Sequence, residues 1–185
     1  EEDRFRQQPG EIRFWASERT YTPVDLDEAA ARLQAEQLLQ AVGLTPTGDY
    51  RVDVEAHRDD AGAVTEWTIF YTPEWDGLLH MGGEIIIRTG ASGITEFWYN
   101  WCDVEETGKT YPVADLLTPE AAVRRLEEAV GWRFEPETGV IKDPVFSLQQ
   151  AYYLREQEFV PCWMFENEGH CYWFDAQTGE FYGNN

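Results

Sequence analysis

Residues 159–183 read FVPCWMFENEGHCYWFDAQTGEFYG, and this stretch decides the expected fold of the C-terminal part of the chain. EFVPCWMF and CYWFDA are rich in aromatic residues, and a short polar loop, ENEGH, separates them. Two apolar strands joined by a tight polar loop are typical of a β-hairpin. DAQTGE then predicts a last turn into a short EFYG strand. We therefore interpret this stretch as the end of a β-sheet and not as a catalytic site.

The DAQTGE segment, residues 175–180, carries the residues of a tight turn. We predict that Gly179 adopts a positive φ and that the side chain of Asp175 or Thr178 hydrogen-bonds the turn backbone. A calcium loop of the EF-hand type needs oxygen ligands at alternate positions and a distal Glu, and this segment is too short for that. The sequence therefore favours a structural turn over a metal site.

Three cysteines are present, Cys102, Cys162 and Cys171. An odd number does not define a disulfide framework, and we expect Cys102 to be unpaired. Cys162 and Cys171 flank the hairpin loop. If the hairpin pivots between Phe165 and Asn167, they lie opposite each other and within disulfide reach. If it pivots one residue later, they are out of register, and two separate thiols are the alternative.

Hydrophobic periodicity predicts two helices. The first covers about residues 26–42, where Asp25 and Glu28 have the form of a capping box and Gly43 ends the helix. The second is expected to begin at Pro119, with the preceding Thr as its N-cap.

The segments around the helices have the pattern of strands. YRVDVEAHRD at residues 50–59 alternates strictly between apolar and polar side chains, which is typical of a half-buried strand. Further strands are predicted over residues 11–15, 64–72, 78–89, 94–101 and 145–157. The Gly82-Gly83 pair suggests a bulge in the strand over 78–89. Residues 1–10 are polar and are expected to form a loose lead-in.

The two predicted helices resemble each other, which indicates an internal repeat. Both open with Glu-Ala-Ala, at Glu28 and Glu120, and both end with Ala-Val-Gly. A helix covering a sheet removes the apolar surfaces of both from water. We therefore expect an α+β fold with two tandem helix-on-antiparallel-sheet halves. The expected divisions are a lead-in with a short strand (1–24), a first helix-plus-meander half (25–108) and a second half (109–185).

The composition limits the classes of partner. The formal net charge is −21, so phosphate repulsion excludes nucleic acid and anionic membrane surfaces as expected partners, and a basic protein partner is favoured. No apolar run approaches the ~20 residues that span a bilayer. The chain opens EEDRFRQQPGE, without an initiator Met or a signal peptide. We expect that a leader or membrane anchor has been removed from its N-terminus.

The tryptophans are the candidate partner-binding residues. Trp98 and Trp101 lie on opposite faces of one strand if that strand is regular, so one of them is expected at a surface. Trp163 and Trp173 belong to the C-terminal hairpin and are also candidates. Exposed aromatic side chains would mark a partner-binding patch.

The C-terminal part of the chain resembles a known family. The DAQTGE turn, the preceding strand FVPCWMF (159–165) and the segment YPVADLLTPEAAVRRLEEA are similar to PepSY-like domains, and in particular to YycH/YycI-type regulators. The likeness covers roughly residues 109–183. It implies an extracytoplasmic, secreted or membrane-tethered protein that restrains a sensor histidine kinase, and it supplies no catalytic residue. This chain departs from the family in having no N-terminal transmembrane helix.

We expect a non-catalytic binding or regulatory module, modulating a membrane sensor kinase or a peptidase through the outer domain of that protein. No catalytic, cofactor-binding or metal-binding residue is assigned, and no cofactor is expected. Two alternatives are a carboxylate-based glycan hydrolase and a carbohydrate-binding module. The first predicts two acids, one with a raised pKa, converging in a cleft. The second predicts coplanar exposed Trp rings.

Overall fold

A computed structural model describes the protein at residues 4–8, 11–17, 19–80, 83–101, 103–105, 108–130, 134–135, 140–141, 147–167 and 170–184. The chain divides into two compact units. The first unit comprises Glu1–Gly77 and Gly82–Val104, and the second comprises Leu78–Met81 and Glu105–Asn185.

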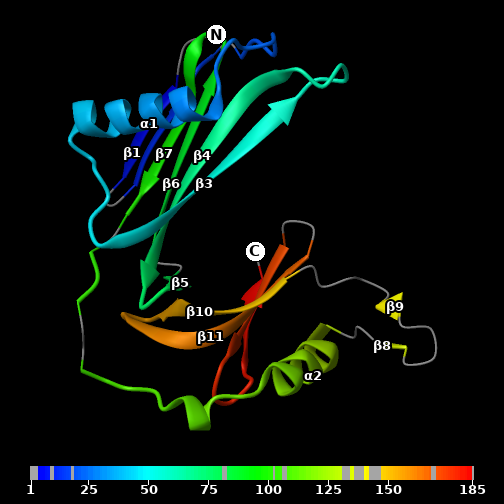
Figure 1. Ribbon diagram of the computed structural model, residues 1–185. Coiled ribbons are helices and arrows are strands. Elements are labelled where there is room, and N and C mark those ends of the chain that lie inside the picture. Colours follow the sequence, from blue (N-terminus) through cyan, green and yellow to red (C-terminus); the bar gives the residue numbers. More distant parts are fainter. Residues whose placement is uncertain are drawn as a thin grey trace. The chain divides into compact units, whose positions relative to one another are not determined.

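The first unit is built on an antiparallel sheet (Figure 1). Its strands are β1 (Arg4–Gln8), β2 (Glu11–Trp15), β3 (Asp49–Arg58), β4 (Val64–Trp75), β6 (Glu84–Gly90) and β7 (Gly93–Asn100). The strand order is β1-β2-β7-β6-β4-β3, and every neighbouring pair is antiparallel. The predicted strand over 11–15 is confirmed. The expected loose lead-in is wrong for residues 4–8, which pair with β2.

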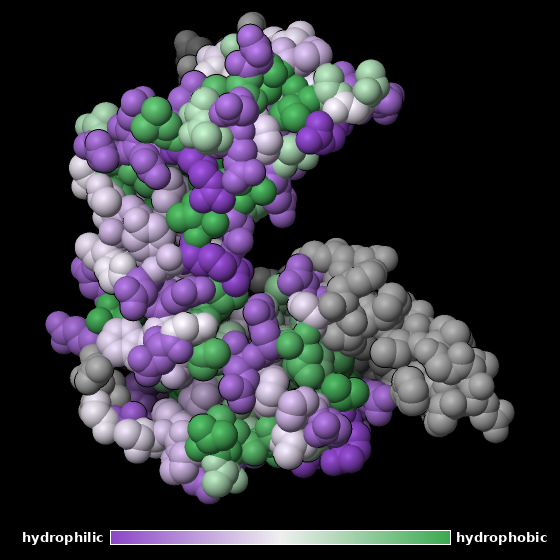
Figure 2. Space-filling model, in the orientation of Figure 1, coloured by the Kyte–Doolittle hydropathy of each residue, from purple (hydrophilic) through white to green (hydrophobic). Residues whose placement is uncertain are grey.

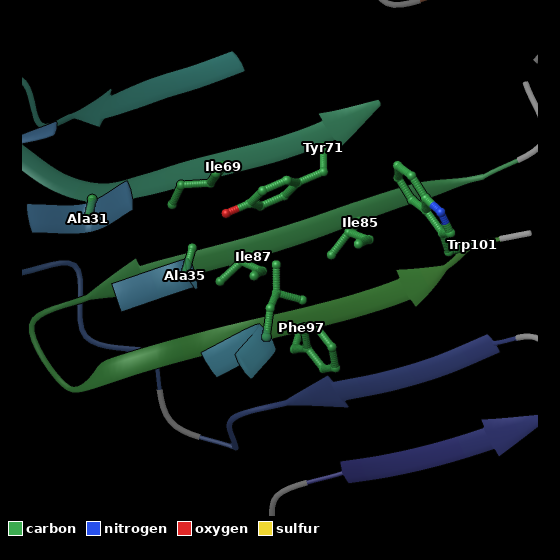
Figure 3. Packing of buried hydrophobic residues seen from close by; sticks show 9 residues of the cluster. Ala31, Ala35, Ile69, Tyr71, Ile85, Ile87, Phe97 and Trp101 are labelled. Atoms are coloured by element: carbon green, nitrogen blue, oxygen red, sulfur yellow. The ribbon is translucent and has the colours of Figure 1, made fainter. Parts of the chain in front are cut away.

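Helix α1 (Glu28–Val42) covers one face of this sheet. The prediction of this helix is confirmed, but its N-cap is Asp27, whose side chain accepts a hydrogen bond from the Ala30 N–H, and not Asp25. Gly43 ends the helix with φ +70°, as expected of a C-cap glycine. The buried side of α1 packs on the strands that Figure 3 shows beneath it. This cluster contains Ala31, Ala35, Leu39, Ile69, Tyr71, Ile85, Ile87, Phe97 and Trp101.

The second unit has a sheet of order β5-β10-β11-β12-β13. Its strands are β5 (Leu78–His80), β10 (Ser147–Arg155), β11 (Glu158–Asn167), β12 (His170–Asp175) and β13 (Phe181–Asn184). β5 is parallel to β10, and the other pairs are antiparallel. The unit also contains a short 3-10 helix η1 (Val113–Asp115), helix α2 (Pro119–Val130) and a separate strand pair, β8 (Phe134–Glu135) and β9 (Val140–Ile141).

Strand alternation in the second unit produces two apolar clusters. Ala122 and Leu126 of α2 pack with Trp163, Phe165 and Phe174. The cluster on the other side consists of Ala151, Cys162, Met164 and Trp173, with Tyr153 and Tyr182 packed against it. The predicted start of α2 is confirmed, since the Thr118 hydroxyl accepts a hydrogen bond from the Ala121 N–H at 3.3 Å.

The expected fold class, α+β with two tandem helix-on-antiparallel-sheet (PepSY-like) halves, is wrong. Strands make up 49% of the structure and helices 20%, so the fold is dominated by a mixed sheet. Two features account for the difference. The β1–β2 hairpin adds strands next to β7, and the predicted strand over 78–89 is two strands, of which β5 belongs to the second unit as a parallel strand. The bulge expected at Gly82 lies outside the described residues.

Candidate protein-binding face

The sheet of the first unit has a second face, opposite the one that α1 covers. Three side chains form a row across the middle of it, because Phe70 pairs with Ile86 and Ile86 with Trp98. Asp53 continues this row on β3, and Arg13 continues it on β2. We call this surface the open face and Phe70, Ile86 and Trp98 its central row. All three are partly exposed, and none belongs to the apolar clusters formed by the described residues.

Arg13 stacks on the central row. Its guanidinium carbon lies 4.2 Å from the centroid of the Trp98 ring and 5.8 Å from that of Trp15, which is cation–π geometry. Its Nε lies 2.6 Å from Oε1 of Glu11, so the cation is also ion-paired. One side of the Trp98 ring is therefore occupied by a guanidinium group. The Trp98 Nε1 is buried and has no hydrogen-bond partner among the described residues.

One flank of the central row is held by a shared carboxylate. Glu96 Oε2 lies 2.7 Å from Nη2 of Arg19 and 3.4 Å from Nη1 of Arg88. Burial by itself lowers the pKa of Arg19, but the hydrogen bond and the charge of Glu96 outweigh it, and the pKa is raised. The cations of this flank are thus already compensated by the protein's own carboxylate.

The other flank carries Glu84, which pairs with Asn100 across β6 and β7. Burial raises the pKa of Glu84, because a half-buried carboxylate loses hydration. No cation of the described residues forms an ion pair with it. The open face therefore has one carboxylate next to its central row whose charge is not compensated.

The structure separates the four predicted partner-binding tryptophans. Trp98 lies partly exposed on the open face, and Trp101 lies in the core under α1, where its ring meets Tyr50 edge-on at 6.2 Å. This confirms that the two lie on opposite faces of the strand. Trp163 and Trp173 are 6% and 2% exposed. Trp163 donates its indole N–H to the Leu117 carbonyl at 3.1 Å. Of the four, only Trp98 is available to a partner.

The hairpin register decides between the two arrangements of the cysteines. Asn167 pairs with His170, so Cys162 stands opposite Asp175 and Cys171 opposite Glu166. The disulfide between Cys162 and Cys171 is therefore not formed, because the pivot lies beyond Asn167. Cys162 is buried, donates its thiol to the Ala151 carbonyl at 3.2 Å, and has its pKa raised to about 12 by burial. Cys102 lies outside the described residues.

The DAQTGE turn has the structural chemistry expected of it. Asp175 Oδ1 accepts hydrogen bonds from the backbone N–H groups of Gln177 and Thr178 at 2.8 and 2.7 Å, and Gly179 has φ +72°. Burial alone raises the pKa of Asp175, but hydrogen bonds from Tyr182, Thr178 and Gln177 outweigh it and lower the pKa. Within the described part of the chain, no group of three or more His, Cys, Asp or Glu side chains is placed to hold a metal ion.

Sequence reasoning did not identify most of the open face. Phe70, Ile86, Arg13 and Glu84 were not singled out, although their strands were predicted. The available signal was that the strands over 64–72 and 78–89 carry apolar residues at consecutive positions, so they present apolar side chains to both sides of the sheet.

No described helix is both long enough and apolar enough to cross a membrane. Neither the known protein-family models nor the curated proteins contain a match to this chain.

Proposed function

We propose that the chain is a non-catalytic binding module and that the open face of its first unit holds a basic protein partner. The observation that carries this proposal is the central row of Phe70, Ile86 and Trp98, which is partly exposed and lies between ion-paired polar flanks. An apolar centre with a polar rim is the common anatomy of a protein interface. The net charge of −21 favours a basic partner by long-range attraction.

The setting we propose is extracytoplasmic, with the chain secreted or tethered to a membrane. The partner would be the outer domain of a sensor kinase or a peptidase. This part rests on the resemblance of residues 109–183 to YycH/YycI-type regulators. The open face itself supports only the narrower statement that the partner presents apolar and basic side chains together.

Binding of a glycan is less well supported. Sugar rings stack on free faces of aromatic side chains, and Arg13 already occupies one side of the Trp98 ring at 4.2 Å. The glycan-hydrolase alternative requires two carboxyl groups that act together. Glu84 has a raised pKa, but Glu11, which also pairs with Asn100, is ion-paired with Arg13.

The proposal is tested by selecting ligands from a random peptide library displayed on phage, with the full chain immobilised. We expect the selected peptides to combine Lys or Arg with large apolar residues. Ile86→Ser should weaken their binding at least tenfold, because a central contact residue is removed. The matched control is Leu33→Ser, since Leu33 is an aliphatic residue of α1 that is 53% exposed.

A second pair of variants protects the test against loss of folding. Trp98→Ala should weaken binding in the same way, and Tyr21→Ala should not, because Tyr21 is an aromatic residue 67% exposed in the loop before α1. Circular dichroism and the unfolding midpoint show whether each variant is folded. Peptides whose binding survives both Ile86→Ser and Trp98→Ala, or an empty selection together with binding to a glycan array, would contradict the proposal.

A further inference from the structure

We infer that the partner occupies the open face with a basic amphipathic α-helix that lies across the strands, with a Lys or Arg of that helix paired to Glu84. This inference rests on the proposed function and specifies the occupant of the same site. It follows from a comparison of the two faces of the sheet, from the backbone hydrogen bonds of its strands, and from the charges beside the central row.

The two faces of the sheet carry equivalent apolar rows. On the covered side, Ile69 pairs with Ile87 and Ile87 with Phe97. The adjacent residue of each strand points to the other side, and these residues form the central row. Figure 3 shows α1 passing across the strands over the covered row, with Ala31 and Ala35 facing it. The same three strands thus offer a second, similar row to a second helix.

The dimensions of the central row fit one side of a helix. Two interstrand spacings of ~4.8 Å place Phe70 and Trp98 roughly 10 Å apart. Residues i and i+7 of an α-helix are separated by a rise of about 10.5 Å. Apolar side chains at i, i+3 or i+4, and i+7 therefore cover all three residues, as the positions 31, 35 and 39 do on the covered side.

An extended segment is a poor occupant of this surface. The strands that carry the central row, β4, β6 and β7, each have a neighbour on both sides. Their backbone N–H and C=O groups are used in those ladders, so a strand laid on the face would find no backbone partners. A helix forms its backbone hydrogen bonds internally and can be desolvated against side chains without this cost.

The charges on the open face favour a basic helix. Arg13 is paired with Glu11, and Arg88 with Glu96, so the cations are compensated. Glu84 has no such partner among the described residues, and a cation placed there would stabilise its charged form. A second copy of this chain is a poor occupant, because two chains of net charge −21 repel each other.

Two synthetic peptides of identical Lys/Leu composition test the inference. In the first, the leucines recur at i, i+3, i+4 and i+7; in the second, Leu and Lys alternate. We expect the first peptide to bind the full chain at least tenfold more tightly than the second. Its far-ultraviolet circular dichroism should gain helical signal on binding, and Ile86→Ser should weaken its binding at least tenfold.

Glu84→Gln tests the paired charge. It should weaken binding of the helical-period peptide at least threefold and reduce the dependence of affinity on salt. The matched control is Glu36→Gln, which removes an exposed carboxylate from α1 on the covered side. An effect of Glu36→Gln equal to that of Glu84→Gln would show attraction by net charge alone and would overturn the inference.

Failure of the inference can be told apart from failure of the proposed function. Tighter binding of the alternating peptide, or no binding of either peptide, overturns the helical occupant. The function stands or falls separately, by whether phage-selected ligands lose binding with Ile86→Ser.

Discussion

The faces that the two sheets turn away from their helices differ in burial. In the second unit, Cys162, Met164 and Trp173 on the face opposite α2 are 0, 5 and 2% exposed, and Tyr153 and Tyr182 pack against their cluster. In the first unit, the central row opposite α1 is only partly buried. Arg13 and other charged side chains surround it.

The difference separates an apolar face that serves stability from one that is available for contact. Both sheets have large apolar residues on the face away from the helix, so hydrophobicity alone does not distinguish them. Burial does: the Trp173 ring lies 5.7 Å from that of Tyr153, whereas Trp98 is covered on one side by a cation. Figure 2 shows that hydrophobic residues on the visible side of the molecule lie in small groups between hydrophilic ones.

The largest expected effect tests this comparison directly. Trp173→Ala should lower the free energy of unfolding by about 3–5 kcal/mol, because it empties a buried site. Trp98→Ala should lower it by no more than about 1–2 kcal/mol, since the ring already contacts solvent and loses mainly its contact with Arg13. Urea denaturation followed by circular dichroism measures both. Equal losses for the two variants would remove the distinction between the faces.

A smaller effect is expected at the start of β6, beside the open face. A Cβ at Gly83 would lie 2.6 Å from the Asn100 carbonyl oxygen and 3.0 Å from the Trp101 Cα, and neither backbone atom can easily move. Gly83→Ala should therefore destabilise the first unit by about 1–3 kcal/mol. Gly90→Ala is the control, because the nearest atoms to its Cβ would be 3.5 Å away. Thermal unfolding of both variants decides, and a stable Gly83→Ala protein would place β6 differently.

The smallest effect concerns pH. Burial raises the pKa of Glu84 in the folded chain above its unfolded value of about 4.3, so the folded state holds that proton more tightly. Its contribution to stability is therefore fully present below the unfolded pKa and is lost as the pH rises through the folded pKa. Glu84→Gln should remove this dependence and raise stability near pH 7 by less than about 1 kcal/mol. Unfolding midpoints between pH 4 and 7 test it, and an unchanged pH profile would contradict the raised pKa.

Patterns within short segments predicted the local structure well. The alternation over 50–59 correctly placed Val52 and Val54 on the side that packs under α1, and the helix ending at Gly43 was correct. The turn residues Asp175 and Gly179 adopt the expected roles. These features depend on side-chain period, capping and backbone freedom at one place in the chain, and all of these are present in the sequence.

The candidate site was predicted only in part. Trp98 was a candidate, but so were Trp101, Trp163 and Trp173, because aromatic residues look the same in sequence whether they lie in a core or at a surface. Phe70 and Ile86 were missed because their importance depends on which strands lie beside them. Their alignment with Trp98 is a property of cross-strand register, which no single segment contains.

The sequence by itself determined where helices and most strands form, how the DAQTGE turn is made, and that the chain is strongly acidic. Only the tertiary structure decided that residues 78–80 leave the first unit to pair with β10, that Cys162 and Cys171 stand out of register, and that Trp98 lies partly exposed while Trp173 is buried. The reason is physical: local conformation follows from a residue and its near neighbours, whereas strand partners, register and burial follow from hydrogen bonds and contacts between segments far apart in the chain.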